Sequence, residues 1–204
     1  MPRVEQRKLD ELIQDLSTCP KEYVVSKWII DVVPALFDGD KELYLKTKLD
    51  IASGLMIDTS SVIFVGSSCL GFSMNPNKDF KMFDEESDID IAIISNHYFN
   101  EAWRWLRMQD PSLLNDKEKH SYKAHRNYYI FDGTIATDKI LHLLPFGPQW
   151  LNVIGKLRNN PVFQNKELNF RLYQDHKSLI DYHVHNLKKN MTKLLDVQPT
   201  SITL

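Results

Sequence analysis

Two aspartates separated by one residue, Asp88 and Asp90, form the pattern of this chain best suited to chemistry. They stand in the run ESDIDIAII, which is β-branched enough to predict a buried strand. Side chains alternate along a strand, so both carboxylates share one face, and the other face takes Ile89, Ile91 and Ile93. Two close carboxylates repel unless a proton or a cation relieves them, and oxygen ligands favour Mg²⁺ or Mn²⁺. The pair therefore predicts a metal site at the edge of a strand.

A small-residue turn precedes the aspartates. The apolar run SVIFV reads as a second buried strand that ends at Gly66, Ser67 and Ser68. Glycine reaches backbone angles closed to other residues, serines can cap a helix and offer hydroxyls, and a helix N-terminus binds phosphate. The G-K-[ST] ending of a P-loop is absent. We expect a phosphate-binding turn of another kind.

Together, Gly66, Ser67, Asp88 and Asp90 resemble the signature of the polymerase-β-like nucleotidyltransferase superfamily. The resemblance implies an α/β (α+β) fold with a mixed sheet flanked by helices. It further implies that the Gly-Ser turn holds a nucleoside triphosphate (NTP), while the carboxylates hold two ions of Mg²⁺ or Mn²⁺. One ion would activate an acceptor hydroxyl and the other would stabilise the pyrophosphate leaving group.

Such enzymes carry a third carboxylate on a later strand. Asp138 is our first choice for this catalytic, metal-binding role and Asp132 is the second; Asp138 is equally suited to capping the turn after Ile135. Arg171, in the strand-like segment 168–173, is a candidate to bind phosphate, although a lone charge on an amphipathic strand more often faces solvent.

The segment between the two motifs, Phe72 to Glu86, is longer than compact members of the superfamily use. It resembles small bacterial and phage-borne members, which suggests a toxin–antitoxin or phage-defence setting. The acceptor stays open among an RNA 3′ end, a protein hydroxyl and a small molecule. The alternative is a catalytically degenerate fold that binds a nucleotide or a partner protein, and oligomerisation is also left open.

Composition bounds the remaining classes. The chain has 204 residues, 43% hydrophobic and 25% charged, with a net charge of −2. The length and the hydrophobic content are enough for one core. The slightly negative net charge excludes the overall positive potential of a non-specific DNA binder. The basic run KEKHSYKAHR, residues 117–126, is either a local nucleic-acid patch or, more commonly, a solvated helix face.

Neither a membrane nor an oxidising compartment is indicated. No apolar run approaches the ~20 residues of a membrane span, and the N-terminus lacks the apolar stretch of a signal peptide. Cys19 and Cys69 form no disulfide or zinc pattern, and Cys69 is expected in the core. We expect a cytoplasmic protein.

Hydrophobic periodicity predicts helices before and after an alternating core. We expect a helical segment over 1–55, a nucleotidyltransferase-like core over 56–174 and a C-terminal helix and tail over 175–204, packed as one domain. Within the core, a helix capped by Ser95 or Asn96 should run to about Met108. The aromatic stretch 127–135 should form the third strand, and 168–173 another.

Overall fold

A mixed four-stranded sheet lies at the centre of the protein. The computed structural model describes residues 3–78 and 80–195. The strands are β1 (Val62–Val65), β2 (Ile89–Ile94), β3 (Thr134–Ala136) and β4 (Leu168–Tyr173). Their order is β1-β2-β4-β3, with β2 and β4 parallel and the two outer pairs antiparallel. The predicted α/β class with a mixed sheet between helices is confirmed at this level.

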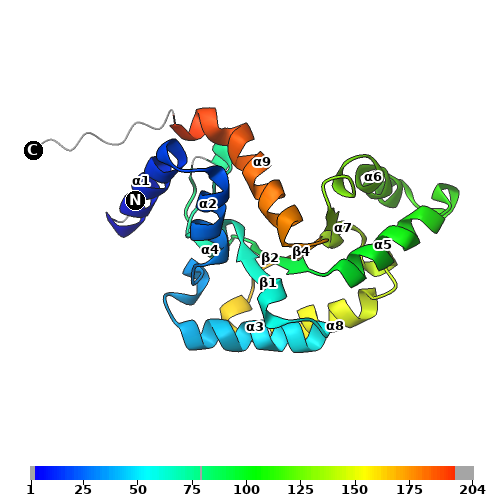
Figure 1. Cartoon of the computed structure of the whole chain (residues 1–204). Helices are drawn as coiled ribbons and strands as arrows, with labels where there is room; N and C mark the ends of the chain where they lie inside the picture. The colour runs from blue at the N-terminus through cyan, green and yellow to red at the C-terminus, as the bar shows by residue number, and fades with distance from the viewer. Residues whose placement is uncertain (1–2, 79, 196–204) are drawn as a thin grey trace, which may run out of the picture.

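Helices cover both faces of the sheet, and Figure 1 shows them above and below it. Alternation along β2 assigns the faces: Ile89, Ile91 and Ile93 join the lower core, whereas Ala92 and Ile94 join the upper one. The prediction that the isoleucines take the face opposite the aspartates is confirmed.

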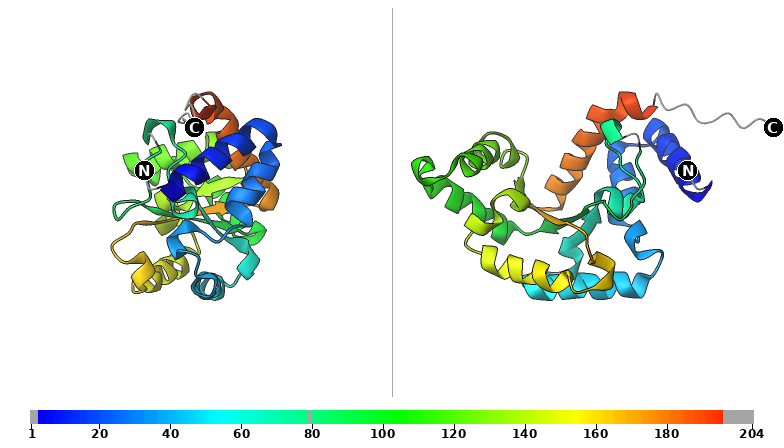
Figure 2. Two further views of the ribbon diagram at one scale, coloured as in Figure 1. Left: turned by 90° about the vertical axis from the view of Figure 1, so that its left-hand side faces the viewer. Right: turned by 180° about the vertical axis from the view of Figure 1, so that it is seen from behind.

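The lower layer consists of α3 (Lys41–Leu55), α5 (Asn96–Met108) and α8 (Gly147–Leu157). In Figure 2, α3 and α8 remain together beneath the sheet when the molecule is turned. The predicted cap of α5 is present, because the Ser95 hydroxyl accepts the N–H of Tyr98 over 3.3 Å. Trp150, on α8, is fully buried in this core.

The upper layer consists of α1 (Arg3–Thr18), α2 (Lys21–Val25), α4 (Gly66–Leu70) and α9 (His176–Leu195). A π-helical turn, Ser26–Ile30, continues α2. The helices of segment 1–55 are therefore divided, with α1 and α2 above the sheet and α3 below it (Figure 1).

At the end of the molecule away from α1 lie α5 and α6 (Asp116–Ala124), drawn in green in Figure 1. A π-helical turn, His125–Tyr129, continues α6, and α7 (Thr137–Ile140) follows β3 directly. The short 3₁₀ turns are Ala35–Phe37, Thr59–Ser61, Pro76–Lys78, Pro111–Leu113, Leu141–Leu143 and Pro161–Phe163.

The third strand was predicted wrongly over most of its length. Residues 127–129 are helical, and the strand begins only at Thr134. The reason is local: Asn115 and Glu118 form a reciprocal capping box that starts α6, and the helix propagates into the aromatic residues. Helical geometry leaves Tyr128 exposed instead of pairing it in the sheet.

No helix within residues 3–78 and 80–195 combines the length and apolar composition that a membrane span requires.

Candidate active site

The turn after β1 lies directly against the second aspartate of the Asp-x-Asp pair. Val65 is opposite Asp90 in the antiparallel register, so the chain leaves β1 beside that carboxylate. Gly66 then takes φ +67°, and a β-carbon added there would stand 2.7 Å from Oδ2 of Asp90. Only glycine fits this left-handed position so close to the carboxylate.

The two carboxylates differ in exposure. Asp88 lies just before β2 and is exposed, whereas Asp90 is partly buried on the upper face. Burial and the nearby charge of Asp88 raise the pKa of Asp90, while Arg171 and a hydrogen bond from the Asn169 side chain act against this rise. The Asp138 charge raises the same pKa further. A bound cation would therefore offset the repulsion that Asp88 and Asp138 exert on the ionised Asp90.

Sheet topology separates the two candidates for a third carboxylate. β3 runs antiparallel to β4, so its last residue, Ala136, pairs with Arg171 near the edge that holds Asp90. Asp138 follows that end of β3, whereas Asp132 precedes its other end, where Thr134 pairs with Tyr173. The structure brings Asp138, and not Asp132, to the edge of Asp88 and Asp90.

Two buried side chains fix the segment that carries Asp138. Nε2 of His125 accepts the backbone N–H of Ala136 over 3.1 Å, and its Nδ1 donates to the carbonyl of Ser121 over 2.7 Å. Burial lowers the pKa of His125, which favours the neutral ring that these two bonds require. The hydroxyl of Thr137 donates to the carbonyl of Phe170 on β4.

Arg171 does not face solvent, contrary to the commoner fate of a lone strand charge. It shares the upper face with Asn169 and is half-buried. Its Nη1 donates to the hydroxyl of Tyr182 over 3.0 Å, and its guanidinium lies 5.6 Å from the ring centre of Tyr129. Burial acts to lower its pKa, but tyrosine hydroxyls and Asp138 raise it overall. Within the described residues no carboxylate lies within 4.0 Å of it, so the guanidinium keeps donors for an anion.

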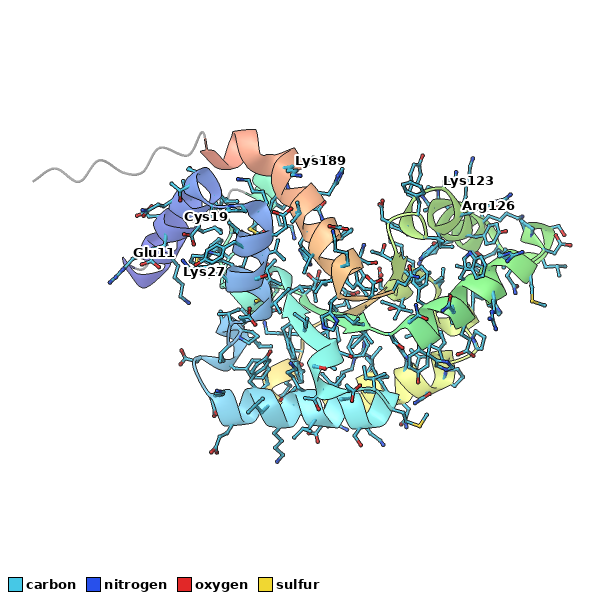
Figure 3. All side chains as sticks on the ribbon, viewed as in Figure 1. Glu11, Cys19, Lys27, Lys123, Arg126 and Lys189 are labelled. Atoms are coloured by element: carbon cyan, nitrogen blue, oxygen red, sulfur yellow. The ribbon has the colours of Figure 1, made fainter. Side chains whose placement is uncertain are left out.

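A large cavity of about 890 Å³ opens beside the aspartates, and we call it the main cavity. One wall comes from residues 73–78 and 81–82, within the segment that we expected to be an insertion. A hydrogen bond from the Ser73 N–H to the Lys81 carbonyl (2.8 Å) joins the two ends of this wall. The facing wall is α9, with Asn186, Leu187 and Lys189; Figure 3 labels Lys189 on the upper part of this helix. Lys78 and Lys81 bring further positive charge.

A smaller cavity of about 240 Å³, the inner cavity, joins the main cavity to Asp138. Gly66, Asp90 and His183 line both, and Asp138 and Arg171 line the inner one. Burial, aided by the Arg171 charge, lowers the pKa of His183 to about 4. Its Nε2 is buried without a hydrogen-bond partner among the described residues. His185, two residues further along α9, is exposed.

The two serines of the turn have different surroundings. Ser67 lines the main cavity. Ser68 is fully buried, and its hydroxyl donates to the carbonyl of Val65 over 3.0 Å. Neither serine caps α4, whose N-cap residue is Val65. The hydroxyl of Ser68 therefore has no access to a ligand, because helix formation turns it back toward β1.

The carboxylates suit a Mg²⁺ ion that takes some of its ligands from water and substrate, and not an ion held by protein side chains alone. No group of three His, Cys, Asp or Glu side chains in the described part of the chain is placed to hold a metal by itself. Mg²⁺ characteristically uses one or two carboxylates, several waters and substrate phosphates. Asp88 and Asp90 match that requirement when a phosphate-bearing ligand supplies the remaining oxygens.

Sequence reasoning missed several residues of the site. Asn169 pairs with Asp90 in the parallel register, and its place two residues before Arg171 on one strand face was a readable signal. On α9, His183, Asn186 and Lys189 recur at helical spacing, which also marks one face. Lys78 carried no pattern that pointed to the site.

Comparison of the chain with protein-family models, curated proteins and solved structures gives no match.

Proposed function

We propose that this protein is a metal-dependent nucleotidyltransferase that moves a nucleoside monophosphate from an NTP to an acceptor hydroxyl. The observation that carries the proposal is the apposition of Gly66 to Asp90: a β-carbon added at Gly66 would lie 2.7 Å from Oδ2 of Asp90. Gly66, Ser67, Asp88 and Asp90 line one cavity, which supports a role of the turn in binding phosphate and of the two carboxylates in binding a metal ion. The proposed setting, toxin–antitoxin or phage defence, rests on resemblance alone.

Residues of the main cavity supply the contacts that a triphosphate needs. Ser67 and Gly66 line this cavity together with Asp88 and Asp90. Lys78 and Lys189 both line this cavity, and their charges would counter those of the outer phosphates. Met74, Met82 and Leu187 offer apolar surface to a base.

In this proposal, residues of the inner cavity surround the transferred phosphate. Asp88 and Asp90 would hold Mg²⁺, which supplies Lewis-acid stabilisation of the developing charge. Arg171 stands beside Asp90 and can donate to a phosphate oxygen. Asp138 is placed to accept the proton of the acceptor hydroxyl.

The experiment is isothermal titration of a non-hydrolysable α,β-linked analogue of each NTP, with and without Mg²⁺. We expect Mg²⁺-dependent binding to the wild type that is lost in Asp88→Ala/Asp90→Ala, with thermal unfolding nearly intact. Pyrophosphate release from the natural NTPs should be lost in the same variant. An equally active double variant would remove the proposal.

A second candidate is a nucleotide-binding protein that does not turn its ligand over. It is favoured by Asn169, an uncharged residue at the strand position directly beside Asp90, and by the absence of a third carboxylate at metal-holding distance within the described residues. Mg²⁺-dependent binding of the analogue without any pyrophosphate release from natural NTPs selects this alternative.

A further inference from the structure

We infer that a third cavity, on the α6 side of Asp138, receives the acceptor, and that the acceptor is a single-stranded nucleic acid whose 3′ end reaches Asp138. The inference rests on the proposed function and names its second substrate. This α6 cavity has a volume of about 750 Å³. Asp138 lines it and also lines the inner cavity, so it stands where the two meet.

The three cavities neighbour one another through shared lining residues. The main cavity shares Gly66 and Asp90 with the inner cavity, and the inner cavity shares Asp138 with the α6 cavity. In the proposed complex, a triphosphate in the main cavity directs its α-phosphate toward the inner cavity and Asp138. A second substrate can approach that phosphate from the α6 side without crossing the first.

The α6 cavity favours an anion. Lys117 and His120 enter it from α6, and Lys139 enters it from α7. The cavity has two carboxylates: Asp138 is the proposed proton acceptor, and Glu118 is already engaged, because it accepts the N–H of Asn115 over 2.9 Å and pairs with Nε2 of His142 over 3.2 Å. No carboxylate of the described residues lies within 4.0 Å of the ammonium of Lys117 or Lys139. A polycationic small molecule would be repelled here.

Positive charge continues beyond the cavity along the same helical arm. Lys123 and Arg126 are exposed there, and Figure 3 labels both on this arm. Aromatic side chains are exposed on it too: Tyr128 is 67% exposed and Phe131 92%. Cations interleaved with exposed rings are the chemistry that binds single strands, because phosphates meet the cations and bases stack on the rings. An acidic peptide would use the cations but not the rings.

The reaction balances with the groups present. The terminal 3′-hydroxyl oxygen forms a bond to the α-phosphorus of the NTP, and the bond from that phosphorus to the bridging oxygen of the β-phosphate breaks. Pyrophosphate leaves toward Lys78 and Lys189 in the main cavity. The hydroxyl proton passes to the carboxylate of Asp138.

The test measures binding of a fluorescently labelled RNA of about a dozen nucleotides with a free 3′-hydroxyl. Lys117→Glu/Lys139→Glu should weaken binding at least tenfold and flatten the slope of log affinity against log salt by about 1.4. The control Lys41→Glu/Lys46→Glu makes the same charge change on exposed positions of α3, below the sheet, and should change affinity less than twofold. Tyr128→Ala/Phe131→Ala removes exposed rings at constant charge and should weaken binding at least fivefold.

Titration of the NTP analogue separates this inference from the proposed function. If the analogue binds but RNA and DNA of the same sequence do not, the acceptor inference is overturned and the proposed function stands. If strand binding is equal in Lys117→Glu/Lys139→Glu and its control, the inference is overturned as well. Strand binding that is weakened in Lys117→Glu/Lys139→Glu and in Tyr128→Ala/Phe131→Ala, but not in the α3 control, supports it, and the tighter of RNA and DNA identifies the strand.

Discussion

The backbone N–H of Ala136 donates a hydrogen bond to Nε2 of His125, which lies buried between α6 and β3. Because Asp138 follows Ala136 closely, His125 acts as a positioning residue for that carboxylate. We expect His125→Phe to lose about 2 kcal/mol of unfolding free energy, since it leaves the Ala136 N–H and the Ser121 carbonyl unpaired. Turnover should fall while the Kd of the NTP analogue holds, and His125→Gln, whose amide can accept the same bond, should recover part of both losses. Wild-type stability and turnover in the Phe variant would contradict this role.

Replacing Gly66 by alanine should weaken ligand binding strongly while lowering the stability of the fold only a little. The left-handed backbone costs alanine about 1 kcal/mol, and its β-carbon would displace the Asp90 carboxylate. Binding of the Mg²⁺-dependent NTP analogue, measured by titration, should weaken at least tenfold.

The matched control is Gly155→Ala in α8. That position is exposed, and nothing lies within 4 Å of an added β-carbon, so helix propensity should stabilise the protein by about 0.5–1 kcal/mol. Equal analogue binding by the two variants would show that the turn does not touch the ligand site.

Asp90→Asn should raise the melting temperature of the metal-free protein at neutral pH although it removes a site residue. Burial and Asp88 raise the folded-state pKa of Asp90, so its contribution to stability is present at low pH and is lost as pH rises through that value. The gap between variant and wild type should therefore grow as pH rises from about 4. Melting curves in EDTA across pH 3–8 measure it, and a lower melting temperature at every pH would refute the raised pKa.

His183 should make the protein acid-sensitive. Its folded-state pKa of about 4 lies below the ordinary histidine pKa of 6.5, so the unfolded chain takes up the proton first as pH falls. The contribution of His183 to the free energy of unfolding is complete above about pH 6.5 and declines between there and pH 4 by about 2 kcal/mol. This is less than the whole pKa shift would give, because solvent reaches part of the side chain. His183→Gln should flatten this decline in urea unfolding curves, while an unchanged pH profile would place the acid sensitivity elsewhere.

Local patterns predicted much of this architecture. The Asp-x-Asp strand, the strand before Gly66, the capped helix after Ser95 and the strand 168–173 all rest on alternation or capping that neighbouring residues decide. Cys69 was expected in the core; it is buried, and burial raises its pKa to about 12.

What the sequence could not show depends on long-range pairing. That β4 inserts between β2 and β3 decides which of Asp132 and Asp138 reaches the site, and no local pattern encodes that strand order. The aromatic stretch after Arg126 has high strand propensity, yet the helix begun at Asn115 continues into it. The environment of Arg171 follows from α9, whose Tyr182 packs across the sheet to meet it.

The division of cores above and below the sheet has a consequence for synthesis on the ribosome. The lower core draws on α3, α5 and α8, so it can close once β4 has emerged. The upper core needs Leu179, Val184 and Leu187 of α9 against helices made at the start of translation. The apolar faces of α1 and α2 therefore lack their contacts with α9 while most of the chain is being synthesised. Chaperones would bind the nascent protein on that side.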